Sequence, residues 1–309
     1  METVPYSPAM IESWNGFNHT ARNGHFMFDR GYMDYHADRF EDASLVVLDE
    51  GRIAGLIAAN RQGEVIYSHQ GLTFGGLVSE TAGTAEVMRM LDACVLTWKA
   101  QGVRQLIYKA LPWIYHRRPA QEDLYWLFRR DAQLIRRDIT TAIDLRSPGR
   151  RSGQRERGGR KAEKAGLVFA RSDRWRDFWG LLTRVLSARH GAEPVHSVAE
   201  IERLAAAFPD SIRLETAERD GSILAGVVMF ESAQVAHAQY IAVGGEGRTL
   251  GALDGLFLHL IRAGAGSRFF DFGISNTDQG YTLNEGLVGQ KEAFGGSAVA
   301  HDFYRLDAL

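Results

Sequence analysis

Residues 223–228 of the chain read Ile-Leu-Ala-Gly-Val-Val, and residues 52–57 read Arg-Ile-Ala-Gly-Leu-Ile. Each run follows a short turn that ends in Asp-Gly or Glu-Gly, so each is predicted to be the second strand of a β-hairpin. The two runs align with Gly226 opposite Gly55, an offset of 171 residues (226 − 55). The same pattern in each half of the chain indicates that one structural unit occurs twice.

Other landmarks keep a similar offset. Tyr240 lies 173 residues after Tyr67 (240 − 67). Gly266 and Gly102, each predicted to end a helix, lie 164 residues apart (266 − 102). In both halves the predicted order is helix, hairpin, strand, glycine-rich turn, amphipathic helix and strand. We therefore predict an α/β fold of two tandem units, each a mixed, mostly antiparallel sheet flanked by helices.

The composition is ordinary for a globular protein. The 309 residues are 45% hydrophobic and 24% charged, and their formal net charge is -2, so no field of one sign favours nucleic acid or an anionic membrane. Cys94 is the single cysteine, which excludes an intramolecular disulfide and a thiolate zinc site, and we expect no metal. The N-terminus lacks a signal-peptide pattern and no run predicts a membrane span, so we expect a cytoplasmic protein.

Between residues 146 and 164 the sequence becomes rich in Arg, Lys, Gly and Ser. We place a domain boundary here, with a first unit at 1–148 and a second at 149–309 that opens with a basic segment, 149–164. Blocks of like charge are commonly interaction segments. This block is either a solvated linker that leads into a polar helix or an anion-binding segment, and the sequence leaves both open.

A strand near the C-terminus is followed by polar side chains. The run Arg268-Phe-Phe-Asp-Phe-Gly-Ile-Ser275 predicts a buried strand that carries Asp271, and the turn region after it presents Asn284, Glu285 and Lys291. Sites in α/β folds tend to form at the carboxyl ends of strands. We therefore treat these residues as candidates for a site.

The repeated unit resembles the GNAT acyltransferase fold, and two such units in one chain resemble the FemAB-type branch. The resemblance covers most of the chain. Its most specific parts are residues 71–77, 109–115, 189–191, 194–197 and 268–296. These segments are similar to bacterial GNAT or FemAB-like proteins associated with polysaccharide and nucleotide-sugar pathways.

FemAB-type enzymes transfer acyl or aminoacyl groups to amines of cell-wall precursors. The resemblance implies that the first GNAT-like unit is the scaffold and acceptor side and that the second is the donor side, with the acceptor in the cleft between the halves. We expect an N-acyltransferase that moves an acyl group from acetyl-CoA or another acyl-CoA to an amine of an amino-sugar, glycan or cell-envelope precursor. The amine would attack the thioester directly, without a covalent enzyme intermediate.

Two alternatives remain open at this point. One is a FemAB-type transferase that uses aminoacyl-tRNA, which is the only case in which we expect a nucleic-acid partner. Several FemAB-type enzymes carry a long helical hairpin thought to engage transfer RNA, and no segment here is long enough to form it. The other alternative is a binding protein that keeps the fold without catalysis, since a fold by itself does not define a function.

The resemblance also assigns residues. Some FemAB-type enzymes have a lysine that bears on acyl transfer in this C-terminal segment; Lys291 takes that place but follows Gln290 instead of Phe. The groups with suitable chemistry for catalysis are Lys291, Asp271, Glu285 and His190. The amides and charge expected to bind the CoA pyrophosphate lie in a glycine-rich loop with Gly244, Gly245, Gly247 and Arg248. The candidates for substrate binding are Lys109, Trp113, Tyr115, His196, Tyr240 and Asn284.

Most of these residues also fit a structural role. Lys291 fits a surface position, Asp271 an acceptor of turn amides, and His190 a cap at a helix C-terminus. Trp113 and Tyr115 fit packing at the domain interface, and the glycine-rich run fits a simple turn between a strand and a helix.

Overall fold

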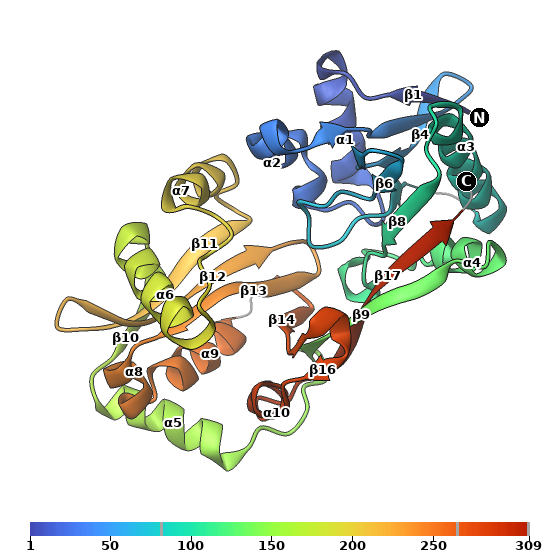
Figure 1. Ribbon diagram of the computed structural model, residues 1–309. Helices are drawn as coiled ribbons and strands as arrows, with labels where there is room; N and C mark the ends of the chain where they lie inside the picture. Colours follow the sequence, from blue (N-terminus) through green and yellow to red (C-terminus); the bar gives the residue numbers. More distant parts are fainter. Residues whose placement is uncertain (81–82, 264–265, 308–309) are drawn as a thin grey trace. The chain divides into compact units, whose positions relative to one another are not determined.

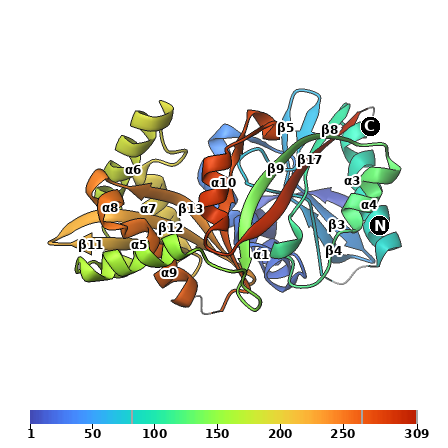
Figure 2. The same ribbon diagram turned by 90° about the horizontal axis from the view of Figure 1, so that it is seen from below.

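The computed structural model describes residues 1–80, 83–263 and 266–307 (Figure 1, Figure 2). The chain forms two compact units. Unit 1 comprises Met1–Asp138, Asn276–Thr282 and Ala300–Leu309, and unit 2 comprises Ile139–Ser275 and Leu283–Val299. The units are interleaved, because β9 (Gln133–Asp144) and β17 (Ser297–Asp307) each pass from one unit into the other. The expected boundary at residue 148 lies inside unit 2.

Unit 1 holds its strands in the orders β1-β3-β4-β7 and β17-β8-β6-β5-β2. The strands are β1 (Glu2–Pro5), β2 (Glu41–Asp42), β3 (Leu45–Asp49), β4 (Arg52–Ile57), β5 (Asn60–Gln62), β6 (Val65–Tyr67), β7 (Leu77–Ser79) and β8 (Gln105–Lys109). The α-helices are α1 (Ile11–Thr20), α2 (Arg30–Met33), α3 (Thr84–Ala100) and α4 (Glu122–Arg129). The apolar residues of α3 recur at helical spacing, are buried and form much of the core of unit 1.

Unit 2 holds its strands in the order β10-β11-β12-β13-β14-β9. The strands are β10 (Val168–Ser172), β11 (Ile212–Arg219), β12 (Ser222–Glu231), β13 (Val235–Val243) and β14 (Phe269–Ile274). The helices are α5 (Gly153–Lys164), α6 (Trp175–His190), α7 (Val198–Ala207), α8 (Gly245–Leu250), α9 (Ala252–Ala263) and α10 (Glu285–Glu292). Helices α6 and α9 cover opposite faces of the sheet (Figure 1, Figure 2). Helix α7 begins with the capping box that the sequence predicts at Ser197 and Glu200.

The basic segment at the start of unit 2 is mostly helical. Helix α5 begins after Ser152, whose hydroxyl accepts a hydrogen bond from the amide of Arg155. Gly158 and Gly159 lie against α9, where a Cβ on Gly159 would come within 2.5 Å of a methyl carbon of Leu258. These glycines therefore permit close helix packing. Arg155 pairs with Asp254 of α9, and the basic residues at 157, 160, 161 and 164 are exposed.

The two units repeat one arrangement of strands, which confirms the predicted fold of tandem, mixed sheets flanked by helices. In unit 2 a single strand, β13, pairs antiparallel with β12 and parallel with β14. In unit 1 two strands share this role, because β7 pairs with β4 while β6 pairs with β8. Residues 68–76 are therefore an insertion that interrupts the strand.

The insertion corrects one detail of the predicted repeat. The three parallel positions of each unit align Tyr67 with His237, and the antiparallel pairs align Leu77 with Tyr240. The expected match between Tyr67 and Tyr240 was wrong, because nine residues (68–76) in unit 1 take the place of two (238–239) in unit 2.

Candidate active site

The pairing of β13 and β14 ends where polar side chains gather in unit 2. The two parallel strands pair at three positions, which are Val235 with Phe269, Ala236 with Phe270 and His237 with Asp271. Strand β14 then turns at Gly273, whose φ of 76° lies in the left-handed region that glycine adopts readily. Within the described residues, β13 therefore has no strand partner on its β14 side after His237.

A bulge in β13 determines which side chains share a face of the sheet. Ala238 belongs to the core beneath α9, so alternation places His237 on the other face. The register between β12 and β13 skips Gln239, which is the extra residue of a β-bulge. The bulge resets the alternation, and the ring of Tyr240 packs against Trp179 of α6 at 5.2 Å. His237 and Tyr240 therefore both face α6.

Asp271 is fully buried, and both of its carboxylate oxygens have partners. Oδ2 lies 2.8 Å from Nδ1 of His237, and Oδ1 accepts a hydrogen bond of 3.0 Å from the amide of Gly273. Acceptance of a turn amide is the structural role that the sequence allows for Asp271. The imidazole is an additional partner, and sequence reasoning missed it.

Lys291 of α10 brings a buried cation to the end of β14. Its ammonium donates hydrogen bonds to the carbonyl oxygens of Gly273 at 2.8 Å and Ile274 at 2.6 Å. Burial lowers the pKa of Lys291 from 10.5 to about 8, and the charge of Asp271 acts in the opposite direction. The surface position considered for Lys291 is wrong, because the residue is only 6% exposed. Within the described residues, one of its three ammonium hydrogens has no acceptor.

Asn284 and Glu285 form the start of α10. The side-chain oxygen of Asn284 accepts a hydrogen bond of 3.0 Å from the backbone amide of Leu287. The backbone amide of Asn284 donates to the carbonyl of Ser275. Glu285 is exposed in the first helical turn, where a negative charge interacts favourably with the helix dipole. Both residues therefore fix the beginning of the helix that carries Lys291.

His196 and Tyr240, two predicted substrate residues, lie together beside α6. Nδ1 of His196 is 2.5 Å from the hydroxyl of Tyr240, and the indole N–H of Trp179 donates to the carbonyl of His196 at 3.1 Å. Both side chains are largely buried. They form a polar and aromatic cluster on the face of β13 that also carries His237.

The glycine-rich loop predicted at Gly244, Gly245, Gly247 and Arg248 is a short helix, α8, and the prediction of a loop was wrong. The amide of Arg248 donates to the carbonyl of Gly244 at 2.9 Å, which closes the first helical turn. Gly247 is buried, and a Cβ there would lie 2.3 Å from the carbonyl oxygen of Leu224. Close backbone packing therefore explains one of the glycines, while Gly245 and Arg248 remain exposed.

Lys109, a predicted substrate residue of unit 1, is held inside that unit. Its ammonium donates to the carbonyl oxygens of His69 at 3.0 Å, Gln70 at 3.2 Å and Leu72 at 2.7 Å. Burial, together with the nearby charge of Arg136, lowers the pKa of Lys109 to about 8. All three ammonium hydrogens thus have acceptors in the inserted loop.

The other three predicted site residues, Tyr115, Trp113 and His190, differ in burial and in the elements that carry them. Tyr115 is buried in unit 1, where its ring packs against Phe74 at 4.6 Å. Trp113 stands on the same 3-10 turn and is 48% exposed. His190 is the last residue of α6, and its side chain lies outside the described part of the structure.

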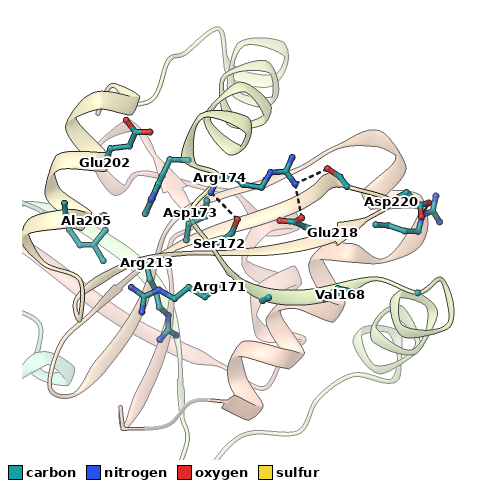
Figure 3. A pocket seen from close by; sticks show the side chains of 18 residues that line it. Val168, Arg171, Ser172, Asp173, Arg174, Glu202, Ala205, Arg213, Glu218 and Asp220 are labelled. Atoms are coloured by element: carbon teal, nitrogen blue, oxygen red, sulfur yellow. Dashed lines mark hydrogen bonds and ion pairs between the residues drawn. The ribbon is translucent and has the colours of Figure 1, made fainter.

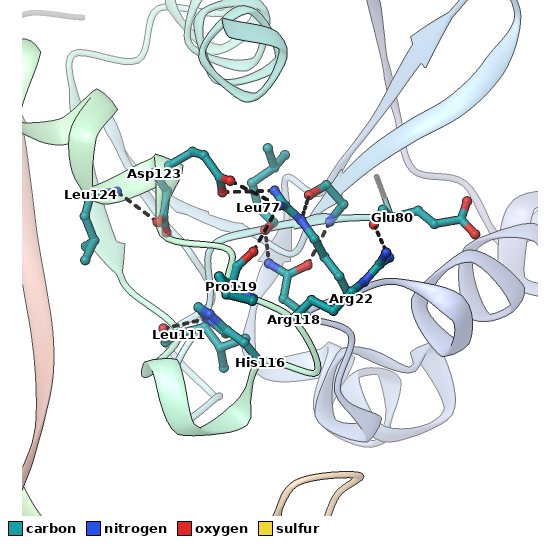
Figure 4. A network of polar contacts seen from close by, with 12 residues as sticks. Arg22, Leu77, Glu80, Leu111, His116, Arg118, Pro119, Asp123 and Leu124 are labelled. Carbon is teal, nitrogen blue, oxygen red and sulfur yellow. Dashed lines mark hydrogen bonds and ion pairs between the residues drawn. The ribbon is translucent and has the colours of Figure 1, made fainter. Parts of the chain in front are cut away.

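A polar network ties β7, β8 and α4 together in unit 1 (Figure 4). Arg22 donates to both carboxylate oxygens of Glu122, at 3.0 and 2.9 Å. The hydroxyl of Tyr108 donates to Asp123 at 2.8 Å and accepts from the amide of Leu77 at 3.0 Å. Burial raises the pKa of Asp123 to about 6. These groups bind one another, so the network has a structural explanation.

An open hollow of about 1160 Å³ lies at the β10 edge of unit 2 (Figure 3). Most of its charged side chains form ion pairs within the protein. Arg174 contacts Asp177 and Glu218, with shortest distances of 2.7 and 2.9 Å. The lining has four arginines and four acidic residues, so it has no excess of one sign that would select a charged ligand.

His237 is the residue of this site that sequence reasoning missed. It stands among small apolar residues in the run Val235-Ala-His-Ala238. A polar residue at one alternate position of an apolar strand was the available signal. Its partner is 34 residues away in the sequence, so only the register of β13 and β14 shows that Asp271 lies beside it.

Two further observations bear on the expected ligands. In residues 1–80, 83–263 and 266–307, no group of three or more His, Cys, Asp or Glu side chains could hold a metal ion. Across the same part of the chain, each helix is too short or too polar to cross a membrane.

Comparison with known proteins identifies a domain match and structures of similar fold. Residues 149–281 match the family described as acetyltransferase (GNAT) domain. The structure of FemX is similar over 98% of this chain and 97% of that chain, with a TM-score of 0.71 and 14% sequence identity. L-PGS from Bacillus licheniformis has a TM-score of 0.62 with 12% identity, over 96% of this chain and 91% of that chain.

A tandem GNAT protein from the clavulanic acid biosynthesis pathway is also similar, with a TM-score of 0.51 and 12% identity over 100% of this chain and 98% of that chain. No curated protein matches the sequence. Residues 149–281 thus match a GNAT domain, and the whole chain has the fold of the FemAB-like tandem GNAT proteins.

Proposed function

We propose that this protein is an N-acyltransferase whose chemistry takes place in unit 2. The observation that carries the proposal is the end of the β13–β14 pairing, with the ammonium of Lys291 at the end of β14. The edge of β13 that no longer pairs with β14 offers backbone groups to an extended ligand. The pantetheine arm of acyl-CoA has amide groups that suit such an edge.

In the proposed reaction a neutral amine attacks the carbonyl carbon of the thioester, and the C–S bond then breaks to release CoA. The remaining ammonium hydrogen of Lys291 donates to the oxyanion of the tetrahedral intermediate, since a fixed donor in a buried site stabilises charge that develops there. No thiol of the enzyme takes part. Cys94 is buried in the core of unit 1, and burial raises its pKa to about 12.

The start of α8 is the proposed place for the pyrophosphate of the donor. Gly244 caps this helix without a side-chain hydrogen bond, and Gly245 and Arg248 are exposed there. Free amides at the start of a helix and a nearby guanidinium both favour an anion.

The proposed acceptor is an amine of an amino-sugar, a glycan or a cell-envelope precursor. His196 and Tyr240 place a polar and aromatic cluster on the same face of β13 as His237. In unit 1, the exposed ring of Trp113 is a candidate platform for a sugar. Aromatic faces combined with hydroxyl or imidazole groups suit a ring that has both apolar and polar sides.

One observation favours a second donor, aminoacyl-tRNA. Arg157, Arg160, Lys161 and Lys164 are exposed on α5 at helical spacing and form a cationic stripe. A stripe of this kind can contact successive phosphates. If it binds transfer RNA, the affinity should fall steeply as salt rises, and replacing two of the four cations with Gln should reduce the salt dependence.

Ligand-induced stabilisation and turnover can distinguish acyl-CoA from aminoacyl-tRNA as the donor. We expect acetyl-CoA or a longer acyl-CoA to raise the Tm, because a ligand at 100 times its Kd stabilises the folded state by about 2.7 kcal/mol. Release of free CoA thiol in the presence of glucosamine would then show transfer. A Tm rise with charged tRNA alone would favour the second donor. No response to either donor would contradict the proposed activity and favour a binding protein.

A further inference from the structure

The attack of the amine and the release of CoA, as proposed above, leave the pair formed by His237 and Asp271 without a role. The two residues are direct partners in the parallel register of β13 and β14, and His237 Nδ1 lies 2.8 Å from Asp271 Oδ2. The side chain of Asp271 is completely buried, whereas that of His237 is 15% exposed. One end of this pair is therefore held inside the protein and the other reaches its surface.

The hydrogen-bond partners determine which ring nitrogen carries the hydrogen. An ionised carboxylate only accepts hydrogen bonds, so Nδ1 of His237 is the donor to Asp271. In the neutral ring, Nε2 then holds a lone pair. Within the described residues Nε2 has no hydrogen-bond partner, so its lone pair is available to a substrate.

Gly273 places this imidazole close to the buried cation. The Cε1 atom of His237 lies 3.4 Å from the position of a Cβ added to Gly273. The carbonyl of the same glycine accepts a hydrogen bond from Lys291, and its amide donates to Asp271. An acceptor of protons and a donor to an oxyanion are therefore arranged around one residue, at the point where β13 and β14 separate.

We propose that His237 is the general base of the acyl transfer and that Asp271 is its positioning residue; this inference rests on the proposed function. Nε2 takes a proton from the amine nitrogen as the new C–N bond forms. When the C–S bond breaks, the imidazolium gives that proton to the sulfur of the leaving CoA. The products are the amide and CoA thiol, and His237 is neutral again. Asp271 holds the ring orientation and stabilises the imidazolium.

The test compares His237→Gln with His259→Gln, a matched change on α9, where the histidine stacks on Phe169. We expect His237→Gln to lower kcat for acetyl transfer to glucosamine by about 10²- to 10⁴-fold. The Tm shift with acetyl-CoA and its KM should stay within about twofold of wild type. His259→Gln should keep the wild-type kcat.

Two further measurements separate a base from a structural residue. Imidazole added to His237→Ala should restore part of the rate, which a purely structural role does not explain. Asp271→Asn should lower kcat while leaving the KM for acetyl-CoA unchanged. If the wild type transfers acetyl groups and His237→Gln retains its full rate, or if imidazole restores nothing to a folded His237→Ala, the assignment of the base is wrong. If the wild type shows no transfer from any acyl-CoA, the proposed function itself fails.

Discussion

The parallel strand pairs β6–β8 and β13–β14 begin alike and end differently. Each pair has three matched positions. In unit 1 the chain then enters the inserted loop, where the hydroxyl of Ser68 accepts a hydrogen bond of 2.7 Å from the amide of Lys109. The amide of Gly75 donates to the carbonyl of Lys109 at 3.0 Å. The loop therefore takes up the backbone groups at the end of β8, whereas unit 2 has only two residues at the equivalent place.

Lys109 of β8 and Lys291 of α10 lie at the ends of these strand pairs and differ in their hydrogen bonds. Burial lowers the pKa of both Lys109 and Lys291 to about 8. Lys109 donates to three carbonyl oxygens of its own loop, but Lys291 donates to two at the end of β14. In unit 1 the ammonium of the lysine is thus fully hydrogen-bonded by its own loop, whereas in unit 2 one ammonium hydrogen of Lys291 has no acceptor within the described residues, as the proposed role in acyl transfer requires.

Exchanging the lysines for apolar residues should have the largest effect. We expect Lys291→Ala to lower acyl transfer by about 10²- to 10³-fold, because it removes the donor to the oxyanion. Lys109→Met should instead lower the free energy of unfolding by about 1–3 kcal/mol, because three buried carbonyl groups lose their donor. Initial rates and urea unfolding of both variants measure this contrast.

If Lys291→Ala kept the full rate, Lys291 would not be the donor to the oxyanion. If Lys109→Met lost transfer while remaining folded and as stable as the wild type, Lys109 would act in the reaction and not in the stability of unit 1.

A substitution inside the inserted loop should act on stability alone. A Cβ on Gly75 would lie 2.0 Å from the carbonyl oxygen of Ser68. Gly75→Ala should therefore cost about 1–3 kcal/mol of stability, as overpacking commonly does. Gly16→Ala is the control, since a Cβ there meets nothing within 4 Å in α1. Equal Tm values for the two variants, or a loss of transfer in folded Gly75→Ala, would show that the loop does not close unit 1 as described.

The pH dependence should distinguish activity from stability. As pH rises through about 8, Lys291 loses its proton, and the rate should fall by about tenfold per unit at higher pH. Both lysines have a lower pKa in the folded state than the 10.5 of the unfolded chain. Between about 8 and 10.5 the unfolded state therefore binds more protons, and the free energy of unfolding rises with pH.

The charge of arginine persists throughout this range, so Lys291→Arg should shift the fall in rate to higher pH. A rate that keeps rising above pH 9.5 in the wild type would rule out a protonated Lys291 as the active form.

The smallest effect is expected for the single cysteine. Cys94 is fully buried on α3 in the core of unit 1, whereas the chemistry is proposed for residues of unit 2. Cys94→Ala should keep the wild-type rate and lose about 1 kcal/mol of stability through the smaller side chain. Loss of transfer in the folded variant would point to a covalent thioester intermediate.

The repeated elements could be predicted because their signals are local. The apolar stripe of α3, the capping box of α7 and the two Gly-containing hairpin strands each follow from residues close in the sequence. The placement of Lys291 and Asp271 in one site also followed from the order of elements around β14.

The features that could not be predicted depend on contacts between residues distant in the sequence. A one-residue change of register moves every side chain of a strand to the other face, so the partnership of His237 with Asp271 could not be predicted. The insertion at 68–76 looked like a glycine-rich turn equivalent to the run after β13. That run is helical despite the low helix propensity of glycine, and its Gly247 packs against the backbone of Leu224.

Hydrogen exchange with and without acetyl-CoA tests most directly whether the donor binds along β13 of unit 2, because it compares both strand pairs in one sample. We expect slower exchange of β13 amides after the bulge, in peptides covering 239–243, when acetyl-CoA is added. We expect no change in peptides covering 65–76 of unit 1. Protection of residues 65–76, or of neither segment while acyl transfer proceeds, would contradict the assignment of the donor site to unit 2.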